Sequence, residues 1–335
     1  MNDNVLSLTD GYLKDELAAV RERILATIQA DLPIADDVLV YAFGRGGKWI
    51  RPRLVMLAHR AVGGADRRAV VIAAAIEMLH LATLLHDDVI DESDERRGRA
   101  SANMRYGNRT AVLGGDYLYT KVFLDLLTEI DQPEIINLVA GVTNEMSVGE
   151  FFQMWWQGKL NLSEEDYFNI IEKKSASLMR TAARCGALAA GGNGGAVLSD
   201  GGAVGALTSY GLNFGLAFQI TDDCMDFTSP SEVMGKDELN DVREGKVTLP
   251  LIYGLRTGAR KKLAGLVESF WNGDGGSECA NEILTLLEDS GALGEAETTA
   301  RRYGEMAKDR LTELAPGDAR DYLARLADWS WQRST

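Results

Sequence analysis

Two clusters of three aspartates are the residues in this chain whose spacing most directly suggests chemistry. The first is the segment DDVID at residues 87–91, and the second is DDCMD at residues 222–226. Each follows a largely apolar segment. On a helix, residues four apart lie on one face, so the first and last aspartates of a cluster are neighbours and the second flanks them. The six candidate ligands are Asp87, Asp88, Asp91, Asp222, Asp223 and Asp226.

Three carboxylates held this close repel one another, and partly buried carboxylates are costly unless something compensates them. A hard cation does so. Magnesium prefers oxygen ligands, keeps several waters and typically takes one or two carboxylates together with substrate phosphates. A single cluster fits a solvated helix end equally well, although acidic groups at a helix C-terminus oppose its dipole. Because the pattern recurs, we predict magnesium sites that bind a diphosphate and polarise its leaving oxygens.

Basic residues accompany the acidic clusters. Each one alone is more often a solvated surface charge, but their repeated position beside the aspartates favours phosphate binding. Arginine offers a planar fork of donors for phosphate oxygens, and lysine a mobile point charge. These residues are Lys48, Arg51, Arg96, Arg97, Lys173, Lys174, Lys236 and Lys246.

The segments that carry these residues are predicted to be helices. Apolar residues recur at helical spacing through most of the 335 residues, and alternating strand-like runs are scarce. The segment 66–91 is apolar on nearly every face, as expected of a helix inside a bundle. We expect an all-α protein with one domain over residues 1–335. Helices are predicted at 11–31, from about 36 to 44, about 52–59, 66–91, 110–129, 133–157, 163–190, 201–227, 248–272, 279–290, 293–314 and 317–333.

Composition limits the class of partner. The net charge of −15 argues against nucleic acid, because phosphate backbones need a basic surface. The three cysteines are far apart and in no CxxC pair, which fits reduced thiols in a cytoplasmic protein. The N-terminus lacks the pattern of a signal peptide. No apolar run is expected to be long enough to cross a bilayer.

Five motifs resemble those of the trans-polyprenyl diphosphate synthases, with bacterial long-chain members the most similar. They occur in the family's order. The motifs are GGKWIRP (46–52), LLHDDVIDESDERRGRASAN (84–103), GDYLYTK (115–121), FQITDDCMDF (218–227) and GKDELNDVREGKVTLPL (235–251).

The resemblance implies a helical bundle around a deep central cavity, the isoprenoid synthase fold, usually as a homodimer. It also implies a reaction. An allylic diphosphate loses pyrophosphate, isopentenyl diphosphate attacks the resulting carbocation, and loss of a proton leaves a trans double bond. An apolar site that excludes water suits such a cation.

The resemblance also assigns residues by their position in the motifs. The six aspartates are expected to hold three magnesium ions on the allylic diphosphate. Contacts to that diphosphate are expected from Arg96, Lys174 and Lys236, with Lys246 and Gln219 nearby. The diphosphate of isopentenyl diphosphate is expected to contact Lys48, Arg51, His80 and Arg97.

The residues before the first cluster bear on product length. Ala82 and Thr83, five and four residues before Asp87, are small, whereas family members with an aromatic side chain there make short products. Filled space cannot also hold an isoprene tail. We therefore predict an octaprenyl to decaprenyl product that supplies quinone side chains. A geranylgeranyl or farnesyl product is the alternative. The predicted tunnel residues are Ala82, Thr83, Met78, Leu79, Val142 and Met146.

Some positions depart from the family pattern. Trp49 stands where a smaller or basic residue is common, Ser175 where threonine is usual, and Leu239 where glycine is frequent. Two rival functions are a terpene cyclase or head-to-head synthase, which has a differently spaced second motif, and a regulatory subunit, which generally loses site residues.

Overall fold

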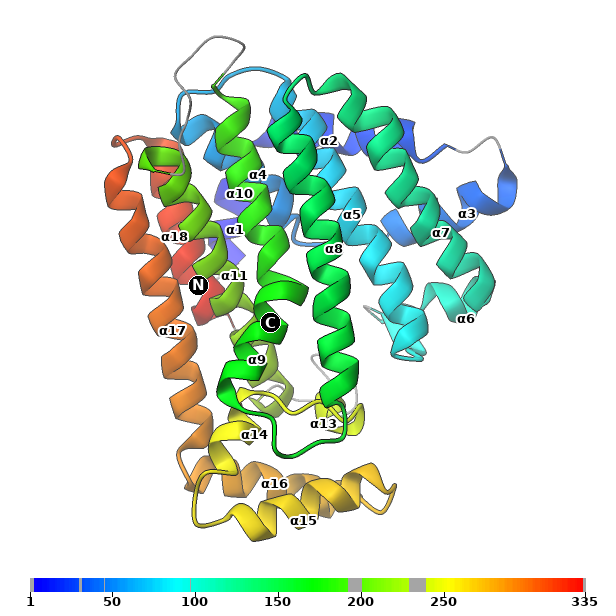
Figure 1. The fold of residues 1–335 in the computed structure, drawn as a ribbon, viewed down its shortest axis with the longest axis vertical. Coiled ribbons are helices and arrows are strands. Elements are labelled where there is room, and N and C mark those ends of the chain that lie inside the picture. The colour runs from blue at the N-terminus through cyan, green and yellow to red at the C-terminus, as the bar shows by residue number, and fades with distance from the viewer. Residues whose placement is uncertain are drawn as a thin grey trace. The chain divides into compact units, whose positions relative to one another are not determined.

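The computed structural model describes residues 3–29, 32–44, 46–96, 98–191, 201–228 and 239–333, and in these ranges nearly all regular structure is helical (Figure 1). The strands are two short segments, β1 (Glu95–Arg96) and β2 (Arg99–Ala100), paired antiparallel with Glu95 opposite Ala100. The predicted all-α class is therefore confirmed. Arg97 and Lys236, two of the predicted site residues, lie outside the described residues.

The chain divides into two compact units, which we describe separately. Unit 1 comprises residues 1–143, 178–211 and 310–326, and unit 2 comprises residues 144–177, 212–309 and 327–335. The helices α8 (Pro133–Trp156), α10 (Ser177–Ala189), α11 (Gly202–Thr228), α17 (Ala292–Arg310) and α18 (Asp318–Gln332) contribute residues to both units. One domain over the whole chain stays a prediction.

Unit 1 is built around α5 (Arg68–Ile90), the helix that ends in the first acidic cluster. It packs against α2 (Lys14–Thr27), α4 (Ile50–Ala61) and α7 (Asn108–Lys121). Burial on several sides explains why α5 is apolar nearly all round. The other helices of this unit include α1 (Asp3–Tyr12), α3 (Pro33–Phe43) and α6 (Ala102–Tyr106), followed after α7 by a π-helical turn (Val122–Leu126) and a 3₁₀ turn (Leu127–Glu129).

By length and composition α5 is also able to span a membrane. It has 23 residues, and its most apolar window has a mean hydropathy of 1.8. The expectation that no apolar run is long enough was therefore wrong for this helix. Because 61% of that window is buried inside the protein, α5 has the character of a core helix.

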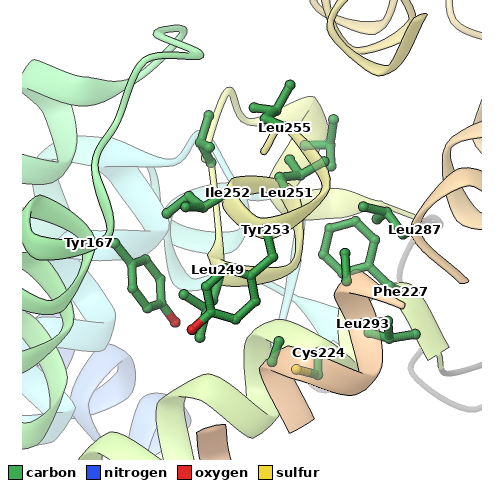
Figure 2. Close-up of a cluster of buried hydrophobic side chains, with 14 of the residues drawn as sticks. Tyr167, Cys224, Phe227, Leu249, Leu251, Ile252, Tyr253, Leu255, Leu287 and Leu293 are labelled. Carbon is green, nitrogen blue, oxygen red and sulfur yellow. The ribbon is translucent and has the colours of Figure 1, made fainter. Parts of the chain in front are cut away.

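Unit 2 has its own apolar core, drawn in part in Figure 2. Aromatic residues Tyr167, Phe227 and Tyr253 pack in it with leucines such as Leu249 and Leu287. Its elements include α9 (Glu164–Ile171), a π-helical turn (Glu172–Ala176), α13 (Asn240–Arg243), α14 (Leu249–Gly254), α15 (Arg260–Trp271) and α16 (Ser277–Asp289). Burial of these side chains is the main stabilising contribution.

Several predicted helices differ from those observed, and three of them show how. The segment 11–31 is two helices, α1 and α2, which meet at the buried Leu13, and the second ends at Thr27. The segment 248–272 is divided because the hydroxyl of Thr257 donates to the carbonyl of Gly254 and accepts from the N–H of Ala259, which ends α14 and begins α15. The segment 163–190 is interrupted by the π-helical turn at Glu172–Ala176.

Candidate active site

The first acidic cluster lies at the C-terminal end of α5. Asp88 is buried, with 2% of its surface exposed, and its two carboxylate oxygens accept hydrogen bonds from Arg96 Nε and from the backbone N–H of Ala102, the latter at 3.4 Å. The β1–β2 hairpin turns the chain back so that both donors reach α5. Asp87 and Asp91, on either side of Asp88 in the cluster, are partly exposed.

A small pocket in unit 1 adjoins this cluster. Three predicted site residues, His80, Asp88 and Arg96, line it together, so the structure brings them to one place. The remaining lining residues are Ala42, Phe43, Gly46, Trp49, Glu77, Leu81, Leu84, Leu85 and Ala102. A mostly apolar pocket with a few convergent charged groups has the character of a ligand site.

The GGKWIRP motif reaches this pocket through Trp49. Its backbone is in the left-handed region (φ 52°), and its ring meets that of Phe43 edge to face at 5.7 Å between centroids. Lys48 is exposed and Arg51 partly buried; neither lines the pocket. A left-handed backbone is costly for a bulky residue and persists only where surrounding contacts enforce it.

Arg53 supports the backbone of the GGKWIRP motif and was not among the predicted site residues. Its side chain is 5% exposed, pairs with Asp10 at 2.5 Å and donates from Nε to the carbonyl of Lys48 at 2.9 Å. A charged residue in an otherwise apolar helical stretch was the only signal available. The buried guanidinium thereby fixes the backbone of Lys48.

Tyr119 of α7 lies close to the first acidic cluster. Burial, with the negative charges of Asp87 and Asp116, raises the pKa of Tyr119 to about 12, so its hydroxyl stays protonated. His86 Nε2 lies 3.4 Å from Asp116 and 3.1 Å from the carbonyl oxygen of Val112. These contacts join His86 of α5 to α7.

The second acidic cluster lies near the C-terminal end of α11, in unit 2. Asp223 is 4% exposed; Tyr167 donates its hydroxyl to one carboxylate oxygen at 2.6 Å, and Gln219 Nε2 donates to the other at 2.7 Å. Burial, followed by the charge of Asp241, raises the pKa of Asp223 well above its usual range. The predicted place of Gln219 near the allylic diphosphate stays a prediction, and Tyr167 was not foreseen.

The outer two aspartates of this cluster have other partners. Asp222 pairs with Arg333 at 2.6 Å, and the guanidinium of Arg333 also donates to the carbonyl of Phe218 at 2.6 Å. Asp226 accepts hydrogen bonds from the backbone N–H groups of Asn240 and Asp241, both at 3.0 Å. These N–H groups begin the short helix α13, where such donors lack helical partners. Arg333 gave no signal in the sequence.

The two clusters share one pattern. In each, the second aspartate is buried and both of its oxygens accept protein hydrogen bonds, while the first and last are partly exposed. Among the described residues, no group of three His, Cys, Asp or Glu side chains forms a ready-made metal site. Magnesium needs none, because it takes a few carboxylates and completes its shell with water and phosphate. The oxygen-only donor set fits such an ion.

Lys174 lies in the π-helical turn between α9 and α10, and π-turns are frequent at functional sites. Its ammonium pairs with Glu150 of α8 at 2.6 Å. The two segments approach closely because residue 149 is glycine; a Cβ there would lie 2.5 Å from the backbone nitrogen of Lys174. Lys246 forms an ion pair with Glu244.

The predicted chain-length residues are mostly in the core. Met78, Leu79 and Ala82 have no exposed surface, and the hydroxyl of Thr83 donates to the carbonyl of His80 at 2.8 Å. Val142 and Met146 of α8 are buried as well. Their role in a tunnel stays a prediction.

Comparison with known proteins gives concordant results. The Polyprenyl synthetase family profile matches residues 33–284. An octaprenyl diphosphate synthase from Haemophilus influenzae is 33% identical over 332 residues, which cover 99% of this chain and 97% of that protein. A short chain isoprenyl diphosphate synthase from Methanothermobacter thermautotrophicus is 34% identical over 317 residues, 94% of each.

A solved structure shares the fold. The crystal structure of a polyprenyl synthase from Caulobacter crescentus CB15, complexed with calcium and isoprenyl diphosphate, has a TM-score of 0.91 at 33% identity and covers 98% of both chains. The all-α architecture is thus that of the isoprenoid synthases. From the family match, the identity over nearly the whole length and the shared fold, this chain belongs to the polyprenyl synthetase family.

Proposed function

We propose that this chain is a trans-polyprenyl diphosphate synthase that condenses isopentenyl diphosphate head-to-tail onto an allylic diphosphate and makes a long, octaprenyl to decaprenyl, product. Membership of the family makes it a prenyltransferase. The observation that carries the proposal is the recurring cluster, with a buried, hydrogen-bonded second aspartate between two partly exposed ones.

The predicted site residues are proposed to form two groups, each binding a different diphosphate. Both acidic clusters, with Arg96, Lys174 and Lys236 and with Gln219 and Lys246 nearby, are proposed to serve the allylic diphosphate. Three magnesium ions, bound by the aspartates, would neutralise that diphosphate and favour its departure. Lys48, Arg51, His80 and Arg97 are proposed to bind isopentenyl diphosphate. The pocket lined by His80, Asp88 and Arg96 supports diphosphate binding beside the first cluster, because it places an apolar wall next to polar and charged groups.

Product length is proposed from volume. Ala82 and Thr83 are the small residues that precede the first cluster, and small side chains leave space for a growing isoprenoid tail. A shorter, geranylgeranyl or farnesyl product is the alternative, since relatives at similar identity include a short-chain synthase. We further propose a cytoplasmic homodimer whose product supplies quinone side chains.

Two non-synthase functions are disfavoured by the site. A regulatory subunit would be expected to lack site residues, whereas all six aspartates are present. A terpene cyclase would consume an allylic diphosphate without isopentenyl diphosphate, so it has no use for Lys48 and Arg51.

The test is to incubate the purified protein with magnesium, farnesyl diphosphate and labelled isopentenyl diphosphate, then separate the dephosphorylated products by length. A ladder ending at about eight to ten isoprene units, the range of the family resemblance, is expected. A product that stops at geranylgeranyl would support the chemistry and contradict the length. Absence of label in any product, with geranyl or farnesyl primer, would reject the synthase proposal.

A further inference from the structure

We infer that Tyr167 is a positioning residue of this active site, which holds the second acidic cluster and the turn carrying Lys174 in one arrangement. This inference rests on the proposed function, because it concerns groups assigned there to the allylic diphosphate. Tyr167 lies outside all five motifs that identify the family in this sequence.

The first argument is the contact itself. Tyr167 is 3% exposed and donates to Asp223 at 2.6 Å, a short distance typical of a hydrogen bond to a carboxylate. Gln219, one turn earlier on α11, donates to the other oxygen. The carboxylate is therefore held by a donor from its own helix and a donor from α9. Of these two donors, Tyr167 is the one that ties it to a different element.

The second argument is that α9 connects directly to the turn that carries Lys174. Its C-terminal end runs directly into the π-helical turn Glu172–Ala176, which contains Lys174. At its N-terminal end, Glu164 accepts from Tyr253 at 3.1 Å and from Arg256 at 2.7 Å. Tyr167 lies between these ends and bonds to α11. The helix is thus anchored at two points, and the second anchor is in the acidic cluster.

The third argument is the surroundings of the bond. Tyr167 packs at the edge of the apolar core beside Leu249 and Tyr253 (Figure 2). Its ring also meets that of Phe168 edge to face at 5.5 Å between centroids. Water cannot readily replace a donor lost from such a site, so a buried carboxylate deprived of it is expected to shift its position. Such a shift disturbs the arrangement of the cluster that Asp223 shares with Asp222 and Asp226.

The test is Tyr167→Phe, which removes the hydroxyl and keeps the ring. We expect kcat to fall about 10- to 100-fold, the equivalent of one lost hydrogen bond to a charged group, and the magnesium concentration for half-maximal rate to rise. The KM for isopentenyl diphosphate is expected to stay within about twofold. The matched control is Tyr210→Phe, another buried tyrosine, whose hydroxyl donates to the carbonyl of Leu323 at 2.7 Å. It is expected to retain wild-type kcat and magnesium dependence.

A second measurement does not depend on turnover. Magnesium with inorganic pyrophosphate is expected to raise the unfolding temperature of wild type and of Tyr210→Phe, and to raise that of Tyr167→Phe much less. If wild type shows this shift but makes no product, the proposed function fails while the inference about Tyr167 stands. Equal shifts in all three proteins would overturn the inference.

A double-mutant cycle with Asp223→Asn decides whether Tyr167 acts through Asp223. The two changes are expected to be strongly non-additive in magnesium dependence, because each removes the same interaction. Additive effects, or a Tyr167→Phe enzyme within twofold of wild type in kcat, would refute the positioning role. If Tyr167→Phe does not fold, Asp223→Asn with the tyrosine intact must still show the weakened response to magnesium and pyrophosphate.

Discussion

Leu239 is a position where two physical effects oppose each other. Its backbone is left-handed (φ 56°, ψ 45°), a conformation that costs a non-glycine residue about 1–2 kcal/mol. Its side chain has no exposed surface and lies in the core of unit 2. Glycine, frequent here in the family the sequence resembles, would relieve the strain and remove the side chain.

The loss of the buried side chain is expected to outweigh the relief of backbone strain. Truncating a buried leucine costs about 2–5 kcal/mol, and glycine adds about 0.5–1 kcal/mol of backbone entropy. Subtracting the relieved strain leaves Leu239→Gly less stable than wild type by about 2–4 kcal/mol. Leu239→Ala loses nearly the same burial and keeps the strain, so it is expected to be less stable than the glycine variant by up to about 1 kcal/mol.

The assay is urea unfolding of the three proteins, together with the magnesium dependence of isopentenyl incorporation. Leu239 precedes the N–H groups of Asn240 and Asp241 that bind Asp226, so both variants should require more magnesium for half-maximal rate. A glycine variant as stable as wild type would refute the reasoning, because strain would then outweigh burial. Alanine more stable than glycine would show that the left-handed backbone carries no cost.

Four further predictions follow from the site and the core. Asp87→Ala and Asp222→Ala should each reduce incorporation by at least about 10³-fold, the loss of several kcal/mol of charge stabilisation, as measured in single-turnover assays; a fully active variant would contradict the metal assignment. Ala82→Phe should shorten the product, read from the product ladder, and lower stability by about 1–3 kcal/mol because Ala82 is fully buried. Burial lowers the pKa of His59 below 6.5, so between about pH 7 and 5.5 the unfolded chain takes up a proton on this histidine that the folded chain does not. The free energy of unfolding should therefore fall as the pH drops through this range, by up to about 1.4 kcal/mol per pH unit. In unfolding titrations, His59→Gln should flatten that slope. A chelator should abolish incorporation, reversibly on adding magnesium, with little change in unfolding temperature, because hydrogen bonds already satisfy Asp88 and Asp223.

What the sequence could predict was mainly local. The spacing of Asp87, Asp88 and Asp91 on one helix follows from helical geometry, and so does the apolar character of α5. The pairing of Gln219 with Asp223, which we did not predict, is local in the same way, because the two residues are four apart on α11. These predictions needed no knowledge of tertiary contacts.

What it could not predict was the set of distant partners. Tyr167 and Asp223 are 56 residues apart, and Arg53 and Asp10 are 43 apart. No periodicity relates such pairs, and a single tyrosine or arginine has no distinctive neighbours in the chain. The break between α14 and α15 was missed for a different reason: one threonine hydroxyl competes locally with the helical hydrogen bonds.

The close approach at Gly149 limits how this site can change over evolutionary time. Side chains such as Glu150 are free to vary in length while the backbone stays in place, but residue 149 has only the hydrogen of glycine between α8 and the turn of Lys174. Any substitution there must displace the backbone of Lys174. Position 149 therefore accepts no larger residue without a shift of the backbone. Evolutionary changes in substrate binding must come from the surrounding positions, where one side chain can be replaced by a larger or smaller one.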